Sequence, residues 1–266
     1  MISSKPLPRK FYTPKPQRLP KRKAMTLVAA FRARQGGVLL CADRKEEEGY
    51  TQREIDKIYY IQELHAFQVF IAGAGPTTII KKANEYIHKA LLNAESDRKT
   101  DILTHHCACI ESSLKAIYSE YKEELDELPM GLIIVVAPRV SGSAPIFYKT
   151  DKSVLSIEPL YCAHGSGRII SDYLQDRLYR HGMHNNALAL LAAFIFREAE
   201  RKASGVGLGT DMVFINEGGQ ASRCELGWDT VTQLQADIPP LMNAIYPCWE
   251  RDAKTLDWLK KKEFCT

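Results

Sequence analysis

The stretch MTLVAAFRARQGGVLLCAD, residues 25–43, decides the fold of this chain. It contains two apolar runs, 26–31 and 38–42, which are joined by a polar turn with two glycines and closed by Asp43. This pattern predicts a β-hairpin. Tight pairing of its strands would place Thr26 beside Asp43. A hydroxyl group beside an acid can form a catalytic site, provided that the amine of the threonine is free to act as a base.

The composition indicates one large domain between two extensions. The chain has 266 residues, 45% hydrophobic and 26% charged, and its apolar runs recur without a linker from residue 26 to about residue 215. We expect a domain over residues 25–228. The segment 229–266 is amphipathic and predicts a helical extension.

The first 24 residues hold eight Lys or Arg and five Pro and no acid, a composition typical of disorder. Three interpretations stay open: a disordered tail, a removable propeptide, or a translation start assigned upstream of the true one. Met25 followed by the small residue Thr26 fits a true start, because removal of Met25 would expose Thr26.

Charge and cysteine content argue against several classes of protein. The formal net charge is +4, but without the first 24 residues about 28 basic side chains face 32 acidic ones, so a nucleic-acid partner has little support. The sequence contains no run of 18 apolar residues, the length needed to span a membrane. Seven cysteines, an odd number, lie mostly in apolar runs, which favours a reduced, cytoplasmic protein.

Two cysteine-containing clusters give weak alternatives. His105, His106, Cys107 and Cys109 are metal-ligand types, but on a helix they point in several directions, and zinc needs four converging ligands. We therefore expect no metal, with Cys109 in the core and both histidines on the surface. Cys162 and His164 would share a strand face, but no third group orients them for nucleophilic catalysis.

Periodicity predicts the other elements, and their order predicts the fold. We expect strands over 56–61, 66–72, 131–137, 145–149, 154–158, 160–163, 211–216 and 221–226, helices over 79–92, 101–125, 168–180 and 185–203, and a solvated connection over 46–53. Runs of strands alternate with pairs of helices. This order predicts an α+β fold, a four-layer αββα sandwich of two stacked antiparallel sheets with a helix pair outside each.

Four short motifs occur in a characteristic order: GVLLCAD (37–43), DKI (56–58), AGAG (72–75) and GSG (165–167). With this order, residues 25–225 resemble the proteasome β-subunit branch of the N-terminal-nucleophile hydrolases. Relatives in that branch include the bacterial ATP-dependent proteasome-like peptidases and the ancestral-β-subunit group.

The resemblance implies a threonine peptidase. Thr26 would be the nucleophile and its free α-amine the base, while Lys57 would favour the ionised hydroxyl and Asp43 would orient Lys57. The backbone N–H of Gly73 would stabilise the oxyanion, and Ser166 and Ser204 would hold the amine and its water. The resemblance also implies a peptide or unfolded-protein substrate, a homo-oligomeric ring, an ATPase or regulator as a possible partner, and no cofactor, nucleic acid or membrane. Glu46 and Glu47, just after Lys45, hint at a preference for basic side chains.

Some residues depart from the family pattern. The turn 34–37 is one residue longer than the family norm, so Met25 could stand in the nucleophile's place. Arg201 stands where the family usually has an Asp, and Thr26 has no free amine while residues 1–25 precede it. The family also contains inactive subunits. The competing interpretation is therefore a catalytically inactive structural or binding subunit on the same fold.

Each candidate residue also has a plain structural explanation. Lys57 after Asp56 resembles an exposed surface pair, which contributes little. Asp43 could cap a turn, Gly73 and Gly75 could be turn glycines, and Ser166 could be a helix N-cap.

Overall fold

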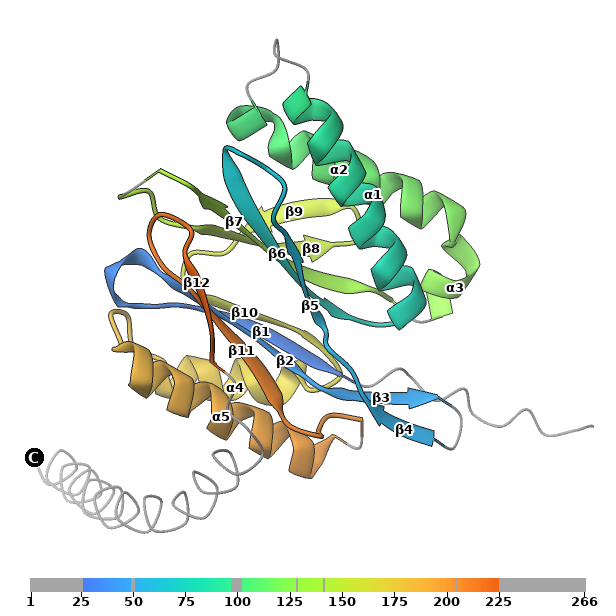
Figure 1. The fold of residues 1–266 in the computed structure, drawn as a ribbon. Coiled ribbons are helices and arrows are strands. Elements are labelled where there is room, and N and C mark those ends of the chain that lie inside the picture. Colours follow the sequence, from blue (N-terminus) through green and yellow to red (C-terminus); the bar gives the residue numbers. More distant parts are fainter. Residues whose placement is uncertain are drawn as a thin grey trace, which may run out of the picture.

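A computed structural model describes residues 26–48, 51–96, 102–127, 129–140, 142–203 and 205–224. Within these residues, two five-stranded antiparallel sheets stack face to face, and helices cover the outer face of each (Figure 1). The predicted αββα sandwich is thus confirmed. The predicted extensions 1–24 and 229–266, together with Met25 and Ser204, lie outside the described residues.

The first sheet is built on the predicted hairpin. Its strand order is β10-β1-β2-β11-β12, with bounds Tyr161–Gly165 for β10, Leu27–Arg32 for β1, Val38–Asp43 for β2, Thr210–Ile215 for β11 and Ala221–Cys224 for β12. In the hairpin, Val28 pairs with Ala42 and Arg32 with Val38. A 3-10 turn, η1 (Arg34–Gly36), forms the tip, where Gln35 and Gly36 have φ of 63° and 77°. The irregular backbone is therefore confined to the tip of the hairpin, and the pairing of its strands is regular.

The second sheet has the order β5-β6-β7-β8-β9. Its bounds are Ile58–Ile61 for β5, Phe67–Ala74 for β6, Gly131–Pro138 for β7, Ile146–Asp151 for β8 and Val154–Ile157 for β9. β7 is a continuous apolar run at the centre of this sheet. Seven of its eight residues are buried, as expected of a strand covered on both faces.

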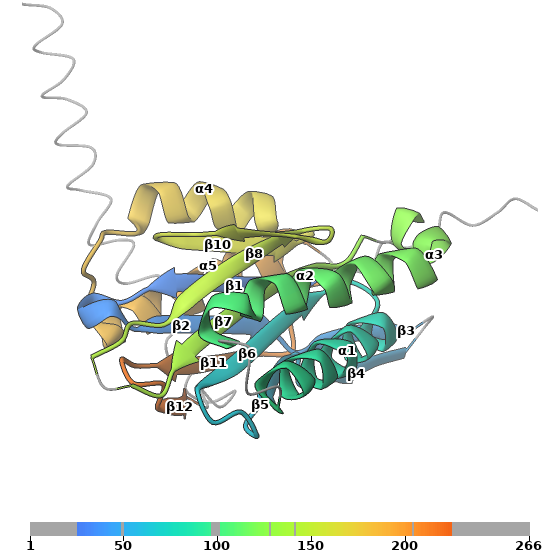
Figure 2. The ribbon, with the colours of Figure 1, turned by 90° about the horizontal axis from the view of Figure 1, so that it is seen from above.

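The helices are α1 (Thr77–Ser96), α2 (Ile102–Glu120), α3 (Lys122–Glu127), α4 (Arg168–Leu178) and α5 (Asn185–Lys202). α1 and α2 pack on the second sheet, and α5 and α4 lie against the first (Figure 2). None of the described helices combines the length and apolar character needed to cross a bilayer.

Alternation along β1 and β2 divides the interior into separate layers. Leu27, Ala29 and Phe31 face the helices of the first sheet. Val28 and Ala30 face the second sheet. Since successive strand side chains point to opposite faces, a hairpin that is apolar at every position is buried on both faces, and it belongs at the centre of a four-layer fold.

The segment predicted as a solvated connection, 46–53, is exposed over 51–53 as expected, but it is not an irregular loop. This segment contributes to a two-stranded antiparallel ribbon, β3 (Lys45–Glu48) and β4 (Thr51–Glu54). Glu46 lies opposite Arg53 and forms an ion pair with it. All four residues of β4 are polar and exposed. The sequence therefore lacks the apolar alternation by which a strand is recognised.

Two other expectations also differ from the structure. The predicted helix over 101–125 is divided at Tyr121 into α2 and α3. His106 is not on the surface. It is 8% exposed, its Nε2 lies 3.0 Å from the Tyr148 hydroxyl and its ring packs near Phe67. The position of His106 on the apolar stripe of α2 explains its burial.

Candidate active site

Thr26, Asp43 and Lys57 come together at the base of the hairpin. The Thr26 hydroxyl donates to Oδ1 of Asp43, and Lys57 Nζ donates to Thr26 Oγ1 over 2.7 Å. The expected proximity of Thr26 and Asp43 is thus confirmed. It follows from the β1–β2 register, because Asp43 lies opposite the residues just before Val28.

The Lys57 ammonium is fully satisfied in this position. Its Nζ lies 3.0 Å from each oxygen of Asp43, and it also donates to Thr26 Oγ1 and to the backbone carbonyl of Lys45. An ammonium has three N–H donors, so hydroxyl, carboxylate and carbonyl use all of them. The lysine side chain is therefore fixed with its charge against the Thr26 oxygen. The exposed Asp56–Lys57 surface pair considered from the sequence does not occur.

The Asp43 carboxylate is equally constrained. Besides Thr26 and Lys57, it accepts from the backbone N–H of Leu27 over 2.8 Å and from that of Lys45 over 3.2 Å. Burial raises the pKa of Asp43, and the Lys57 charge opposes this rise. Burial likewise lowers the pKa of Lys57, against the attraction of Asp43. Their side chains are 8% exposed for Lys57 and 0% for Asp43, so this ion pair is shielded from solvent.

The backbone nitrogen of Thr26 is directed toward the connection between β10 and α4. It donates to Ser166 Oγ over 3.1 Å, and the Thr26 carbonyl accepts from the N–H of Gly167 over 3.4 Å. Ser166 is not the N-cap of α4, because that position is Gly167 and no side chain caps the helix there. The structure thus brings Ser166 to Thr26, as the resemblance implied.

Gly165 is a further residue of the site that sequence reasoning did not single out. Its φ is +100°, and a Cβ atom there would lie 2.1 Å from the Thr26 carbonyl oxygen. Only a residue without a side chain allows this approach. The sequence signal was the GSG motif at the end of a strand, whose first glycine carries the close contact.

Gly73 lies at the end of β6, next to Lys57 in the register of β5 and β6. Its N–H donates to the Lys57 carbonyl over 3.3 Å, slightly longer than the usual range of about 2.7–3.2 Å for such bonds. A Cβ at Gly73 would meet Ile80 at 2.6 Å. The position therefore excludes larger residues because of packing against α1.

The weaker alternatives from the sequence gain nothing from the structure. Cys162 packs between the two sheets, and burial raises its pKa, so it stays a thiol. Burial lowers the pKa of His164 to about 4. Glu46 is ion-paired with Arg53 and also bonds to Thr77, which compensates its charge. Among the described residues, no group of three or more His, Cys, Asp or Glu is placed to hold a metal ion.

Comparison with known proteins agrees with the fold. The profile of the family described as "Proteasome subunit" matches residues 22–215. A search of curated protein sequences gave no match.

Solved structures with a similar fold include Anbu from Hyphomicrobium sp. strain MC1, at 14% identity and a TM-score of 0.68 over 84% of this chain and 97% of that chain. Anbu (ancestral beta-subunit) from Yersinia bercovieri is 12% identical with a TM-score of 0.67 over the same shares. Anbu from Pseudomonas aeruginosa, solved as a helical assembly, is 11% identical with a TM-score of 0.66 over 84% of this chain and 96% of that chain.

Proposed function

Since the chain belongs to the proteasome subunit family, we propose that it is a threonine-type peptide-bond hydrolase whose nucleophile is Thr26, exposed as the N-terminal residue. The observation that carries this proposal is the bond from Lys57 Nζ to Thr26 Oγ1, made within a buried pair with Asp43. A fixed cation at a hydroxyl oxygen favours the alkoxide, which is the attacking species.

The base is the α-amine of Thr26. While residues precede Thr26, its nitrogen is an amide and cannot accept a proton, and the hydroxyl proton points to Asp43. Once the amine is free, its reference pKa of about 7.7–8.0 suits proton transfer near neutral pH. The hydroxyl and the amine belong to one residue, so the base needs no further element to position it. Ser166 Oγ lies 3.1 Å from this nitrogen and holds it in place.

The reaction follows from these positions. The Thr26 oxygen attacks the carbonyl carbon of the peptide bond, and its proton moves to the α-amine. The C–N bond of the substrate then breaks, the protonated amine gives its proton to the leaving nitrogen, and an ester on Thr26 remains. Water, activated by the same amine, hydrolyses this ester and restores the hydroxyl. Lys57 stays protonated throughout and stabilises charge on the threonine oxygen.

For the oxyanion, Gly73 is the donor that the family pattern favours. Its N–H makes the long 3.3 Å bond to the Lys57 carbonyl, which an anionic acceptor can replace because charge-assisted hydrogen bonds are stronger. Ser204 would act on the amine together with Ser166. We also infer assembly with further copies of the chain, as in the Anbu structure titled a helical assembly.

The test compares two forms of the protein, one beginning at Thr26 and one that retains residues 1–25. Fluorogenic peptides should be cleaved by the first form and not by the second. Thr26→Ala should lower kcat/KM at least about 10³-fold, whereas Thr26→Ser, which keeps a hydroxyl, should retain activity. Equal hydrolysis by both forms, or an active Thr26→Ala variant, would overturn the proposal.

A further inference from the structure

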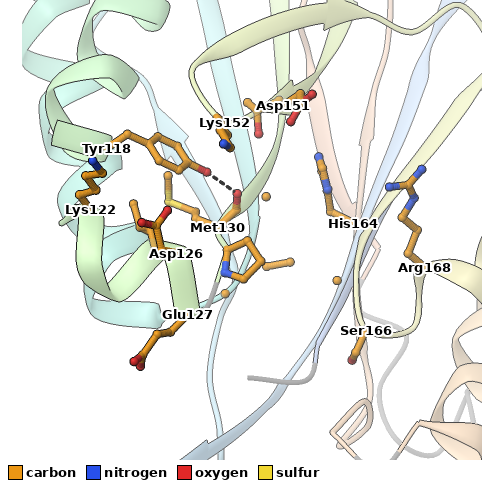
Figure 3. Close-up of a pocket in the computed structure, with 17 residues that line it drawn as sticks. Tyr118, Lys122, Asp126, Glu127, Met130, Asp151, Lys152, His164, Ser166 and Arg168 are labelled. Carbon is orange, nitrogen blue, oxygen red and sulfur yellow. Dashed lines mark hydrogen bonds between the residues drawn. The ribbon is translucent and has the colours of Figure 1, made fainter. Parts of the chain in front are cut away.

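The surroundings of Thr26 differ on the sides of Ser166 and of Lys57. A pocket of about 750 Å³ opens on the side of Ser166, and Figure 3 shows Ser166 on one wall of it and Tyr118 on the other. Its volume is within the usual range of ligand pockets, about 300–1,000 Å³. Asp43 and Lys57 do not line this pocket. The buried ion pair is therefore supported from another side, by residues that are next to it in the sequence.

Each member of the buried ion pair has a sequence neighbour of opposite charge. Arg44 follows Asp43, and Asp56 precedes Lys57. These two neighbours also pair with each other, since Arg44 Nη2 lies 3.8 Å from Asp56 Oδ1. Two ion pairs thus join the two dipeptides, an inner one between Asp43 and Lys57 and an outer one between Arg44 and Asp56.

The backbone that carries Lys57 lies between two strands. Residues 55–57 link β4 to β5 and belong to neither. Arg44 contacts this link and its flank at three points. Its carbonyl accepts from the N–H of Ile55 over 2.9 Å, its Nη1 lies 2.6 Å from Glu54 Oε1, and its Nη2 forms the outer pair with Asp56. Contacts on both sides of Ile55 fix the path of the chain just before Lys57.

Arg44 is itself held by the segment that leads into β11. Its N–H donates to the carbonyls of Gly207 and Gly209, over 3.2 Å in each case. Its Nε lies 3.7 Å from Oδ1 of Asp211, whose side chain is only 6% exposed. A carboxylate this buried needs a compensating charge. Because a guanidinium presents five N–H donors in a rigid planar group, this one side chain reaches carboxylates of β4, of β11 and of the link.

We infer that Arg44 is a positioning residue of the site: by joining Asp211 to the link 55–57, it holds Lys57 Nζ against the Thr26 hydroxyl. The inference rests on the proposed function and adds to it a residue that does not touch the reacting atoms. A displacement of a catalytic group by about 1 Å can lower the rate about 10²-fold. Arg44 does not line the pocket, so its loss should act on kcat rather than on KM.

The experiment compares Arg44→Met and Arg44→Lys with the unchanged sequence, each in the form that begins at Thr26, on one fluorogenic peptide. Arg44→Met should lower kcat at least about tenfold and change KM less than about twofold. Arg44→Lys keeps the charge without the planar group, so its kcat should lie in between. The control is Arg139→Met. Arg139 also joins two segments, by bonds to the carbonyls of Leu64 and Gln62 at the far end of the second sheet, and its loss should leave kcat unchanged.

A second readout does not depend on hydrolysis. Lys57 is 6% exposed, so its reaction with acetic anhydride under native conditions requires the side chain to leave its position. The rate of acetylation, measured by peptide mass spectrometry relative to the exposed Lys81, reports how firmly Lys57 is held. Arg44→Met should raise this rate about fivefold, the factor that corresponds to an ion pair of about 1 kcal/mol. Arg139→Met should not raise it.

Equal acetylation of Lys57 in Arg44→Met and Arg139→Met would overturn the inference, and this comparison remains decisive even if no form of the chain cleaves a peptide and the proposed function fails. In a chain that cleaves peptides, an unchanged kcat in Arg44→Met, or an effect on KM alone, would also overturn it. If Arg44→Met does not fold, Arg44→Lys, which keeps a cation beside Asp211, decides both comparisons.

Discussion

Removing the cation from the buried pair should be among the most destabilising single changes in the described part of the chain. In Lys57→Met, the Asp43 carboxylate remains 0% exposed and loses its ionic partner. Breaking a buried ion pair on one side costs about 3–5 kcal/mol. At about 2–4 °C per kcal/mol for a chain of this size, the melting temperature should fall by roughly 10 °C at pH 7.

The loss should depend on pH in a definite direction. Burial already raises the pKa of Asp43, and Lys57 opposes this rise. Without Lys57, the pKa in the folded state moves further above its unfolded value of about 3.9. The folded state then binds more protons than the unfolded state. Stability is therefore retained below the unfolded pKa and lost as pH rises through the folded pKa. The loss of stability caused by Lys57→Met should be small near pH 4 and reach its full size at neutral pH.

The assay is urea or thermal unfolding followed by far-UV circular dichroism at pH 4 and pH 7. Lys57→Met/Asp43→Asn should recover about 2 kcal/mol at pH 7, because the buried charge is gone. Lys81→Met, an exposed lysine on α1, should change stability by about 0.5 kcal/mol or less. A Lys57→Met cost below about 1 kcal/mol, or a double variant no more stable than the single one, would refute the reasoning.

Three further predictions concern the surroundings of Thr26 and the pocket. Gly165→Ala places a methyl group against the Thr26 carbonyl and should abolish activity and lower the melting temperature, whereas Gly142→Ala, with φ +80° and open space, should cost only about 1 kcal/mol. Ser166→Ala should lower kcat about tenfold and shift the limb of the pH–rate profile that reports the amine; an unchanged profile would contradict this. Tyr118→Phe removes the bond to the Met130 carbonyl and should cost about 1 kcal/mol in urea unfolding.

The layers of the fold could be predicted because the decisive strands are buried on both faces. The 25–43 hairpin and the apolar run of β7 have no polar face, which requires partners above and below. The ribbon of β3 and β4 could not be predicted, since β4 is exposed and strands joined by charged cross-strand pairs show no hydrophobic alternation. The burial of His106 follows from its helical spacing with Ile110 and Leu114, whereas its bond to Tyr148 depends on tertiary structure.

In the site, the pairing of Thr26 with Asp43 followed from hairpin register alone. The role of Lys57 was implied only by the family resemblance. Local sequence does not bring it to Thr26, because Lys57 directly precedes β5, which lies in the opposite sheet. The GSG motif marked the segment of Gly165, but the role of this glycine depends on a close approach between segments about 140 residues apart. The pocket is lined by the ends of helices and strands that are far apart in the sequence. Hydrophobic periodicity predicts each element but not which element ends lie together.

The measurement that tests the central claim most directly is the N-terminal residue of the active protein from its native source, obtained by intact mass and N-terminal sequencing of the fraction that cleaves peptides. The account predicts chains that begin at Thr26, with activity proportional to their amount. Peptide hydrolysis by chains that still carry residues before Thr26 would contradict it.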